Sequence, residues 1–249
     1  MIELLDANCR IGTGPADEPG APVSAAALTA LMDRFGVSAA LVYHTASEFS
    51  DPALGNRLLT EETGESPRFL WQWAVLPAVW GGFTAETELP GEMKRAGVRS
   101  VRLFPKRYGH SLLPYAAGKL MAALAAHRVP AFIPLTELTD WDALYRLCRD
   151  FPENRFVLCS PGYRCLRFLV PIMEACPNLY AETSNFLVHN GIPAFCREMG
   201  DERLLFGSGA PEASLAAAAS QLLLSDIPET SKRRIGAENL RRLLSEVTL

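Results

Sequence analysis

Short apolar runs alternate with longer segments of helical period along the whole chain. The apolar runs are rich in β-branched residues and lack a polar face, which is typical of parallel strands covered by helices. They fall at 2–7, 39–44, 69–76, 98–104, 131–135, 155–159, 179–183 and 204–208. Their spacing, about 25 to 35 residues, indicates repeated strand–helix units.

The segments between these runs carry helix boundary signals. Ser24, Asp51 and Asp140 are candidate N-caps, and Gly36 is a candidate helix end. The helices expected from these signals and from the period cover 25–35, a segment from 52 onward, 115–127, 141–150, 210–224 and 228–247. Both the alternation of apolar runs with helical segments and the candidate caps favour an α/β fold.

Eight strand–helix units in 249 residues predict a (β/α)8 TIM barrel that forms a single domain over 1–249. An open doubly wound sheet is the alternative, and it would require a glycine-rich phosphate-binding turn. The Gly-x-Gly pairs at 12–14 and 207–209 do not complete G-x-G-x-x-G, and no G-x-S-x-G elbow occurs. Nucleotide and α/β-hydrolase chemistry are therefore disfavoured.

Composition narrows the class of protein further. Hydrophobic residues make up 49% and charged residues 21% of the chain, as in soluble enzymes, and no apolar run approaches the roughly 18 residues of a membrane span. The N-terminus resembles no signal peptide, so we expect a cytoplasmic protein without membrane contact. A net charge of −4 does not indicate the basic surface that binds nucleic acid. The six cysteines show no Cys-x-x-Cys spacing and are expected to be buried thiols.

Three segments carry a family resemblance. Residues 5–12 read Leu-Asp-Ala-Asn-Cys-Arg-Ile-Gly, residues 156–162 read Phe-Val-Leu-Cys-Ser-Pro-Gly, and residues 203–211 read Arg-Leu-Leu-Phe-Gly-Ser-Gly-Ala-Pro. They resemble the amidohydrolase-related family, which has Asp-x-His-x-His-x-Gly, Val-Leu-x-His-x-Gly and Phe-Gly-Ser-Asp-x-Pro there. Segments 97–105, 181–184 and 235–243 are also similar to family segments.

The resemblance implies a barrel of hydrolase ancestry with a metal above the carboxyl ends of its strands. At the matching ligand positions, however, this chain has Asn8, Arg10, Ser160 and Gly209. An amide oxygen binds zinc weakly, and a guanidinium has no lone pair to donate. The predicted strand 131–135 also lacks the expected histidine. We therefore expect no metal and no other cofactor.

Cationic and phenolic side chains are expected at the strand ends instead. They are Arg10, Tyr43, His44, Arg102, Lys106, Arg107, Tyr108, Tyr163, Arg164 and Ser184. Guanidinium groups recognise carboxylate and phosphate, so the expected partner is a small anionic molecule. The substrate-binding residues that we predict are Asn8, Arg10, Lys106, Arg107, Tyr163 and Ser160, and the predicted catalytic residues are His44 and Glu137.

Two classes of function are compatible with this set. A metal-independent hydrolase or lactonase would use His44 or Glu137 to activate water, with Arg10 and Lys106 stabilising an oxyanion. A catalytically inactive barrel, a pseudoenzyme, would bind a small anion or a protein partner. A metal site rebuilt from Glu137, Glu182, Glu212 and His44 is a further alternative. A homo-oligomer is compatible with either class.

Overall fold

The computed structural model describes residues 2–64, 66–78 and 85–249. Its strands are parallel to their neighbours and follow one another in chain order. They are β1 (Leu4–Ile11), β2 (Val37–His44), β3 (Phe69–Trp71), β4 (Trp73–Ala74), β5 (Val101–Arg102), β6 (Pro130–Pro134), β7 (Arg155–Cys159), β8 (Leu179–Glu182) and β9 (Leu204–Leu205). Strands β1 to β3 form one sheet and β4 to β9 another.

Backbone hydrogen bonds join the two sheets at both borders. Gln72 N donates to Val42 O at 2.9 Å, and Trp73 N donates to Ser100 O at 3.3 Å, so β3 and β4 are two parts of one barrel strand. At the other border Ala7 N donates to Phe206 O at 2.8 Å. The result is a (β/α)8 barrel. The sequential strand order excludes the doubly wound alternative, in which the order reverses.

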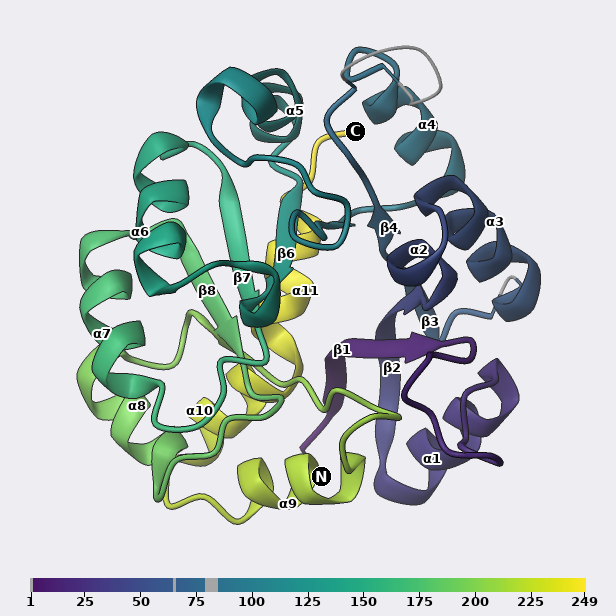
Figure 1. The fold of residues 1–249 in the computed structure, drawn as a ribbon. Helices are drawn as coiled ribbons and strands as arrows, with labels where there is room; N and C mark the ends of the chain where they lie inside the picture. The colour runs from purple at the N-terminus through teal and green to yellow at the C-terminus, as the bar shows by residue number, and fades with distance from the viewer. Residues whose placement is uncertain (1, 65, 79–84) are drawn as a thin grey trace.

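Helices surround the strands as an outer layer (Figure 1). They are α1 (Ala25–Phe35), α2 (Ala46–Phe49), α3 (Pro52–Thr63), α4 (Leu89–Ala96), α5 (Pro114–Ala126), α6 (Trp141–Asp150), α7 (Leu166–Ala175), α8 (Gly191–Met199), α9 (Leu215–Leu223), α10 (Glu229–Arg233) and α11 (Asn239–Ser245), with short turns η1 (Leu135–Glu137) and η2 (Arg234–Glu238). No helix among the described residues combines the length and apolar character needed to cross a bilayer.

The capping predictions are confirmed. The Ser24 hydroxyl accepts from Ala27 N at 3.2 Å, and Gly36 ends α1 in the left-handed conformation. The Asp51 and Asp140 carboxylates cap α3 and α6 at 2.8 and 2.7 Å. Each cap satisfies a backbone N–H that the first helical turn leaves without a partner.

Several predicted boundaries are wrong. The strand expected over 98–104 is only Val101–Arg102, although Ser100 O and Leu103 N also bond to the adjacent strands β4 and β6. The helix expected over 210–224 begins at Leu215, where the Ser214 hydroxyl provides the cap. The segment 228–247 is divided into α10, η2 and α11 by a wider π turn.

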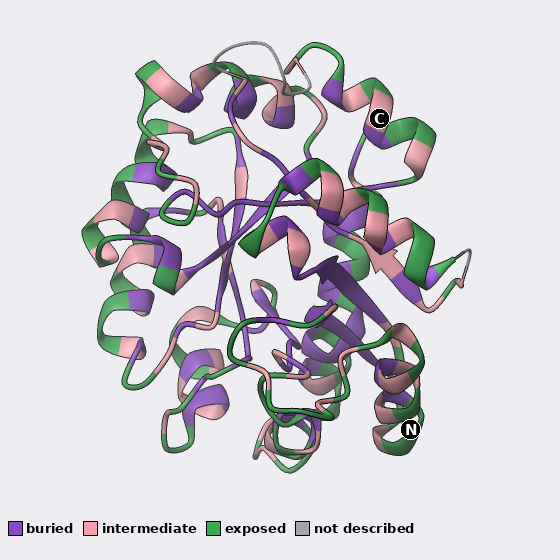
Figure 2. Ribbon diagram, turned by 45° about the vertical axis from the view of Figure 1, so that its right-hand side comes forward, coloured by how far each residue is buried: buried purple, intermediate pink, exposed green. Residues whose placement is uncertain are grey.

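The barrel interior has an apolar lower layer. Inward residues of the strands pack against the last helix, which closes the amino-terminal end of the barrel. This layer consists of Leu5, Ala7, Leu41, Phe132, Val157, Cys159, Leu205, Ala237, Leu240, Leu243 and Leu244. Figure 2 shows the strands mostly in the colour of buried residues, whereas the helices carry exposed outer faces. Beyond this layer, towards the carboxyl ends of the strands, polar side chains such as Arg102 and Glu182 are buried inside the barrel.

Candidate functional site

The first residues above the apolar layer are largely polar and point inward. Successive side chains of a strand alternate between its two faces, so Tyr43 follows inward Leu41, and Glu182 follows inward Tyr180. In β1 a register shift between Asp6 and Cys9 breaks this alternation. The polar set, here called the central cluster, consists of Asn8, Gln72, Arg102, Cys159, Ser160, Glu182 and Ser184.

Arg102 occupies the middle of the central cluster with only 4% of its surface exposed. Its Nη1 donates to Asn8 Oδ1 at 3.1 Å, to Gln72 Oε1 at 3.2 Å and to Cys159 Sγ at 3.8 Å. The guanidinium also lies over the Tyr43 ring, 4.2 Å from its centroid. Its Nε is buried and has no hydrogen-bond partner among the described residues. Within those residues no carboxylate forms an ion pair with it.

Glu182 is the fully buried carboxylate of the cluster. It accepts from Ser160 N at 2.6 Å, from Ser184 N and Oγ at 2.5 Å each, and from Asn8 Nδ2 at 3.2 Å. Burial raises its pKa, and the bonds from Ser184 and Ser160 oppose that rise. Because its acceptor sites are occupied, Glu182 holds the cluster together and has little capacity left for a ligand.

Arg10, predicted to bind the anion, is instead neutralised by carboxylates of the protein. Its Nε donates to Glu212 at 2.8 Å, and Nη1 and Nη2 both contact Asp17. Nη1 also donates to Gly12 O at 2.8 Å and to Thr45 Oγ1 at 3.2 Å. The Arg10 guanidinium holds the pKa of Asp17 below its usual range, so this pair stays charged. Two carboxylates on one guanidinium leave no positive charge for an anion.

His44, predicted as a catalytic base, faces the helix layer. It follows inward-facing Tyr43 in β2, so strand alternation turns its side chain outward. Its Nδ1 accepts from Ala46 N at 3.0 Å, and its Nε2 lies 3.3 Å from Glu62 of α3. Both ring nitrogens therefore hold structural partners. The sequence located His44 correctly at a strand end but did not reveal its side.

Glu137, the other predicted catalytic residue, lies on a different element from His44 and is buried rather than solvent-facing. Its Oε2 accepts from Arg107 N at 2.9 Å. The side chains of Lys106 and Arg107 are exposed; Lys106 Nζ reaches Thr136 O at 3.4 Å, and the Arg107 guanidinium stacks on Phe49. These residues border the barrel mouth, and their hydrogen bonds and ring contact involve described residues other than Arg102.

Of the other predicted binding residues, the structure brings Asn8 and Ser160 into the central cluster. The Ser160 hydroxyl lies 3.0 Å from the Ser184 hydroxyl, and Asn8 bridges Glu182 and Arg102. Tyr163, in contrast, is 70% exposed. Its ring is stacked by its neighbour Arg164 and points away from the buried cluster. Tyr163 is therefore close to Ser160 in the sequence but does not belong to the central cluster.

Glu48 is a candidate that the sequence analysis missed. It lies on the short helix α2 and accepts from the Tyr43 hydroxyl at 3.0 Å. Burial raises its pKa, and the nearby Arg102 charge opposes that rise. A carboxyl with a raised pKa beside a cation is suited to proton transfer. No motif marks Glu48, although its place just after a strand end was a usable signal.

Cys159 is inert as a nucleophile despite its position. Burial raises the pKa of its thiol to about 12, so the protonated form prevails at neutral pH. Burial also raises the pKa of the Cys9 thiol. Cysteine chemistry is therefore disfavoured at the strand ends.

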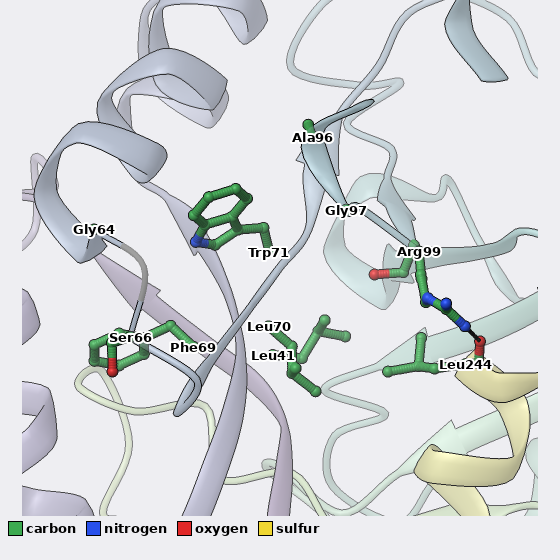
Figure 3. A pocket seen from close by; sticks show the side chains of 11 residues that line it. Leu41, Gly64, Ser66, Phe69, Leu70, Trp71, Ala96, Gly97, Arg99 and Leu244 are labelled. Atoms are coloured by element: carbon green, nitrogen blue, oxygen red, sulfur yellow. Dashed lines mark hydrogen bonds between the residues drawn. The ribbon is translucent and has the colours of Figure 1, made fainter. Parts of the chain in front are cut away.

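A cleft of about 280 Å³ at the opposite end of the barrel is apolar. Figure 3 shows Leu41 and Leu70 next to each other among the lining residues, and Arg99 donates to the carbonyl of Leu244 on α11 at 3.3 Å. Active sites of such barrels occupy the carboxyl-terminal face, because the strand-end loops converge there. The cleft is therefore a packing feature beside the closing helix.

The positions at which the family pattern places metal ligands have other contacts. Asn8 and Ser160 bond within the cluster, Arg10 pairs with Asp17, and Gly209 has no side chain. Among residues 2–64, 66–78 and 85–249, no group of three or more His, Cys, Asp or Glu side chains is arranged to hold a metal ion.

Comparison with known proteins defines the class of barrel. The family model described as amidohydrolase matches residues 15–245, and the chain therefore belongs to the amidohydrolase family. No curated protein matches the sequence.

Solved structures share the fold across nearly their whole length. An uncharacterized TIM-barrel protein from Bordetella bronchiseptica is 16% identical with a TM-score of 0.76, covering 98% of this chain and 99% of its own. The 5-carboxyvanillate decarboxylase from Sphingomonas paucimobilis is 16% identical with a TM-score of 0.69 and full coverage of both chains. A probable 2-pyrone-4,6-dicarboxylic acid hydrolase from Acinetobacter baumannii is 12% identical with a TM-score of 0.72, covering 97% of this chain and 99% of its own. At these identities the likeness establishes the fold.

Proposed function

We propose that this amidohydrolase-family barrel binds a small carboxylate at Arg102 and does so without a divalent metal. The observation that carries the proposal is a buried guanidinium that has an unpartnered Nε and no ion pair with a described carboxylate. Glu48 and Glu182 attract this charge without a direct ion pair, and a bound carboxylate would add charge-assisted hydrogen bonds to the guanidinium. The anion site predicted at Arg10 is thereby moved to Arg102.

The metal part of the proposal rests on the chemistry of the side chains present. A divalent ion in such a barrel needs imidazole or carboxylate donors, and Asn8, Arg10, Ser160 and Gly209 supply neither. The residues do not fit a metal, and the positive charge that it would supply is replaced by Arg102. The ligand class agrees with the names of the structural neighbours, which include a 5-carboxyvanillate decarboxylase and a 2-pyrone-4,6-dicarboxylic acid hydrolase.

Calorimetric titration with benzoate and succinate tests this proposal on protein first passed over a chelating resin. We expect binding to persist after metal removal and Arg102→Met to weaken it about 100-fold, the size of a lost charge-assisted pair. Arg10→Met is the matched variant, because its charge is already neutralised by Asp17 and Glu212. Binding that disappears with the resin treatment, or that depends on Arg10 and not on Arg102, would overturn the proposal.

Metal-independent hydrolysis of an ester or lactone is a second candidate function, favoured by Glu48. Its carboxylate, bonded to the Tyr43 hydroxyl, would act as general base while Arg102 stabilises the oxyanion. We expect Glu48→Gln to lower kcat/KM for γ-butyrolactone or p-nitrophenyl acetate by about 100-fold, within the range typical of a general base. His44→Ala and Glu137→Gln are the companion variants. Activity lost in either of these and retained in Glu48→Gln would return the role to the residue predicted from sequence.

A further inference from the structure

A second cavity, of about 440 Å³, lies outside the central cluster. The loop after β5 forms one wall, and residues from Glu137 of η1 to Asp150 at the end of α6 form the other. Its apolar lining includes Leu112, Leu138 and Leu147. The cavity contains Glu137 and Lys106 but neither Arg102 nor Glu48, so it is distinct from the proposed carboxylate site.

His110 is the unexplained polar group of this cavity. Its backbone N donates to Pro105 O at 2.9 Å, which fixes the loop. Both ring nitrogens are buried, and neither has a hydrogen-bond partner among the residues that the structure describes. Burial lowers the pKa of His110 to about 4, so the ring is neutral at pH 7. A neutral imidazole has one nitrogen that accepts and one that donates, and leaving both unpaired in a buried place is unfavourable.

The charges around the opening nearly cancel. Lys106 and Arg146 supply two cations, and Glu137 and Asp150 supply two carboxylates. The cavity therefore differs from the Arg102 site, where a cation lacks an ion pair with any described residue. An uncharged occupant suits these surroundings better than an anion.

We infer that this cavity binds a small neutral phenol or alcohol, whose apolar body packs on the leucines and whose hydroxyl hydrogen-bonds to His110. A hydroxyl can donate to the unprotonated ring nitrogen, or accept from the protonated one, without a change in the charge of the site. The inference concerns a site separate from the carboxylate site and does not depend on it.

Binding of 4-ethylphenol, followed by the imidazole ¹⁵N signals, tests the inference. The chain has four histidines, and the His110 signals are assigned as those missing from His110→Phe. We expect saturable binding that shifts the His110 signals, weakens about tenfold in His110→Phe, and is equally weak for 4-ethylanisole, in which the hydroxyl is methylated. His189→Phe, at an exposed histidine, is the matched control and should bind like the parent protein.

Two further variants keep the test decisive. Ala143→Trp fills the cavity from α6 and should abolish binding even if His110→Phe folds poorly. Arg102→Met should leave 4-ethylphenol binding unchanged, which separates this site from the carboxylate site. Unshifted His110 signals, or equal affinity for the phenol and its methyl ether, would overturn the inference and leave a cavity that holds water only.

Discussion

Gly207→Ala is expected to destabilise the fold by at least about 3 kcal/mol, in the range of severe core overpacking. A Cβ at this position would lie 2.0 Å from Glu182 Oε2 and 2.8 Å from its Cδ. Neither the Glu182 side chain nor the Gly207 backbone can move readily. Several donors hold Glu182, and the Gly207 N and O each bond the Thr183 hydroxyl at 3.0 Å. The added methyl must therefore break the buried network.

Urea denaturation followed by circular dichroism measures this effect. The matched control is Gly118→Ala on α5, where an added Cβ meets no atom within 4 Å. Alanine in a helix interior should stabilise the protein by about 0.5–1 kcal/mol. Similar midpoints for the two variants would show that Glu182 relaxes freely and that the cluster is not rigid.

Glu182→Leu is expected to cost roughly 3–5 kcal/mol of unfolding free energy, because it leaves several buried donors without an acceptor. The backbone N–H groups of Ser160 and Ser184 would lose bonds of 2.6 and 2.5 Å, and the Asn8 amide a bond of 3.2 Å. Glu182→Gln keeps one carbonyl oxygen and should cost less, although its amide N–H₂ then faces another donor.

The same denaturation measurement distinguishes this cost from a general effect of removing a carboxylate. Glu153→Leu, at an exposed position between α6 and β7, is the control and should change stability by no more than about 0.5 kcal/mol. If Glu182→Leu matched Glu153→Leu, the donors would have found other partners, and the central cluster would not depend on Glu182.

The sequence predicted the barrel well because local physics sets its main features. Strands covered on both faces are largely apolar, and short apolar runs marked all eight barrel strands. Ser24, Asp51 and Asp140 were recognisable as caps because each bonds an amide only three residues away. Boundaries were less predictable. The strand was expected over 98–104, yet the regular strand covers only Val101–Arg102.

The candidate site depended on relations that the sequence does not contain. Arg10 and Arg102 look equivalent as arginines near strand ends. Arg10, however, forms an ion pair with Glu212, which is 202 positions away, whereas the hydrogen bonds of Arg102 to described residues go to neutral groups. His44 lies at the predicted strand end and faces the helix layer, which the sequence did not reveal, because strand alternation becomes informative only once the inward residues are known.

The sequence by itself therefore determined the fold class and the family. Tertiary structure alone decided that Arg102, unlike Arg10, has no ion pair among the described residues, which carboxylate holds the cluster together and that His110 lines a cavity. The physical reason is how far apart in the sequence the interacting residues lie. Caps and strand hydrophobicity are fixed by near neighbours, whereas the charge balance of Arg10, Arg102 and His110 depends on side chains that only the closed barrel brings together.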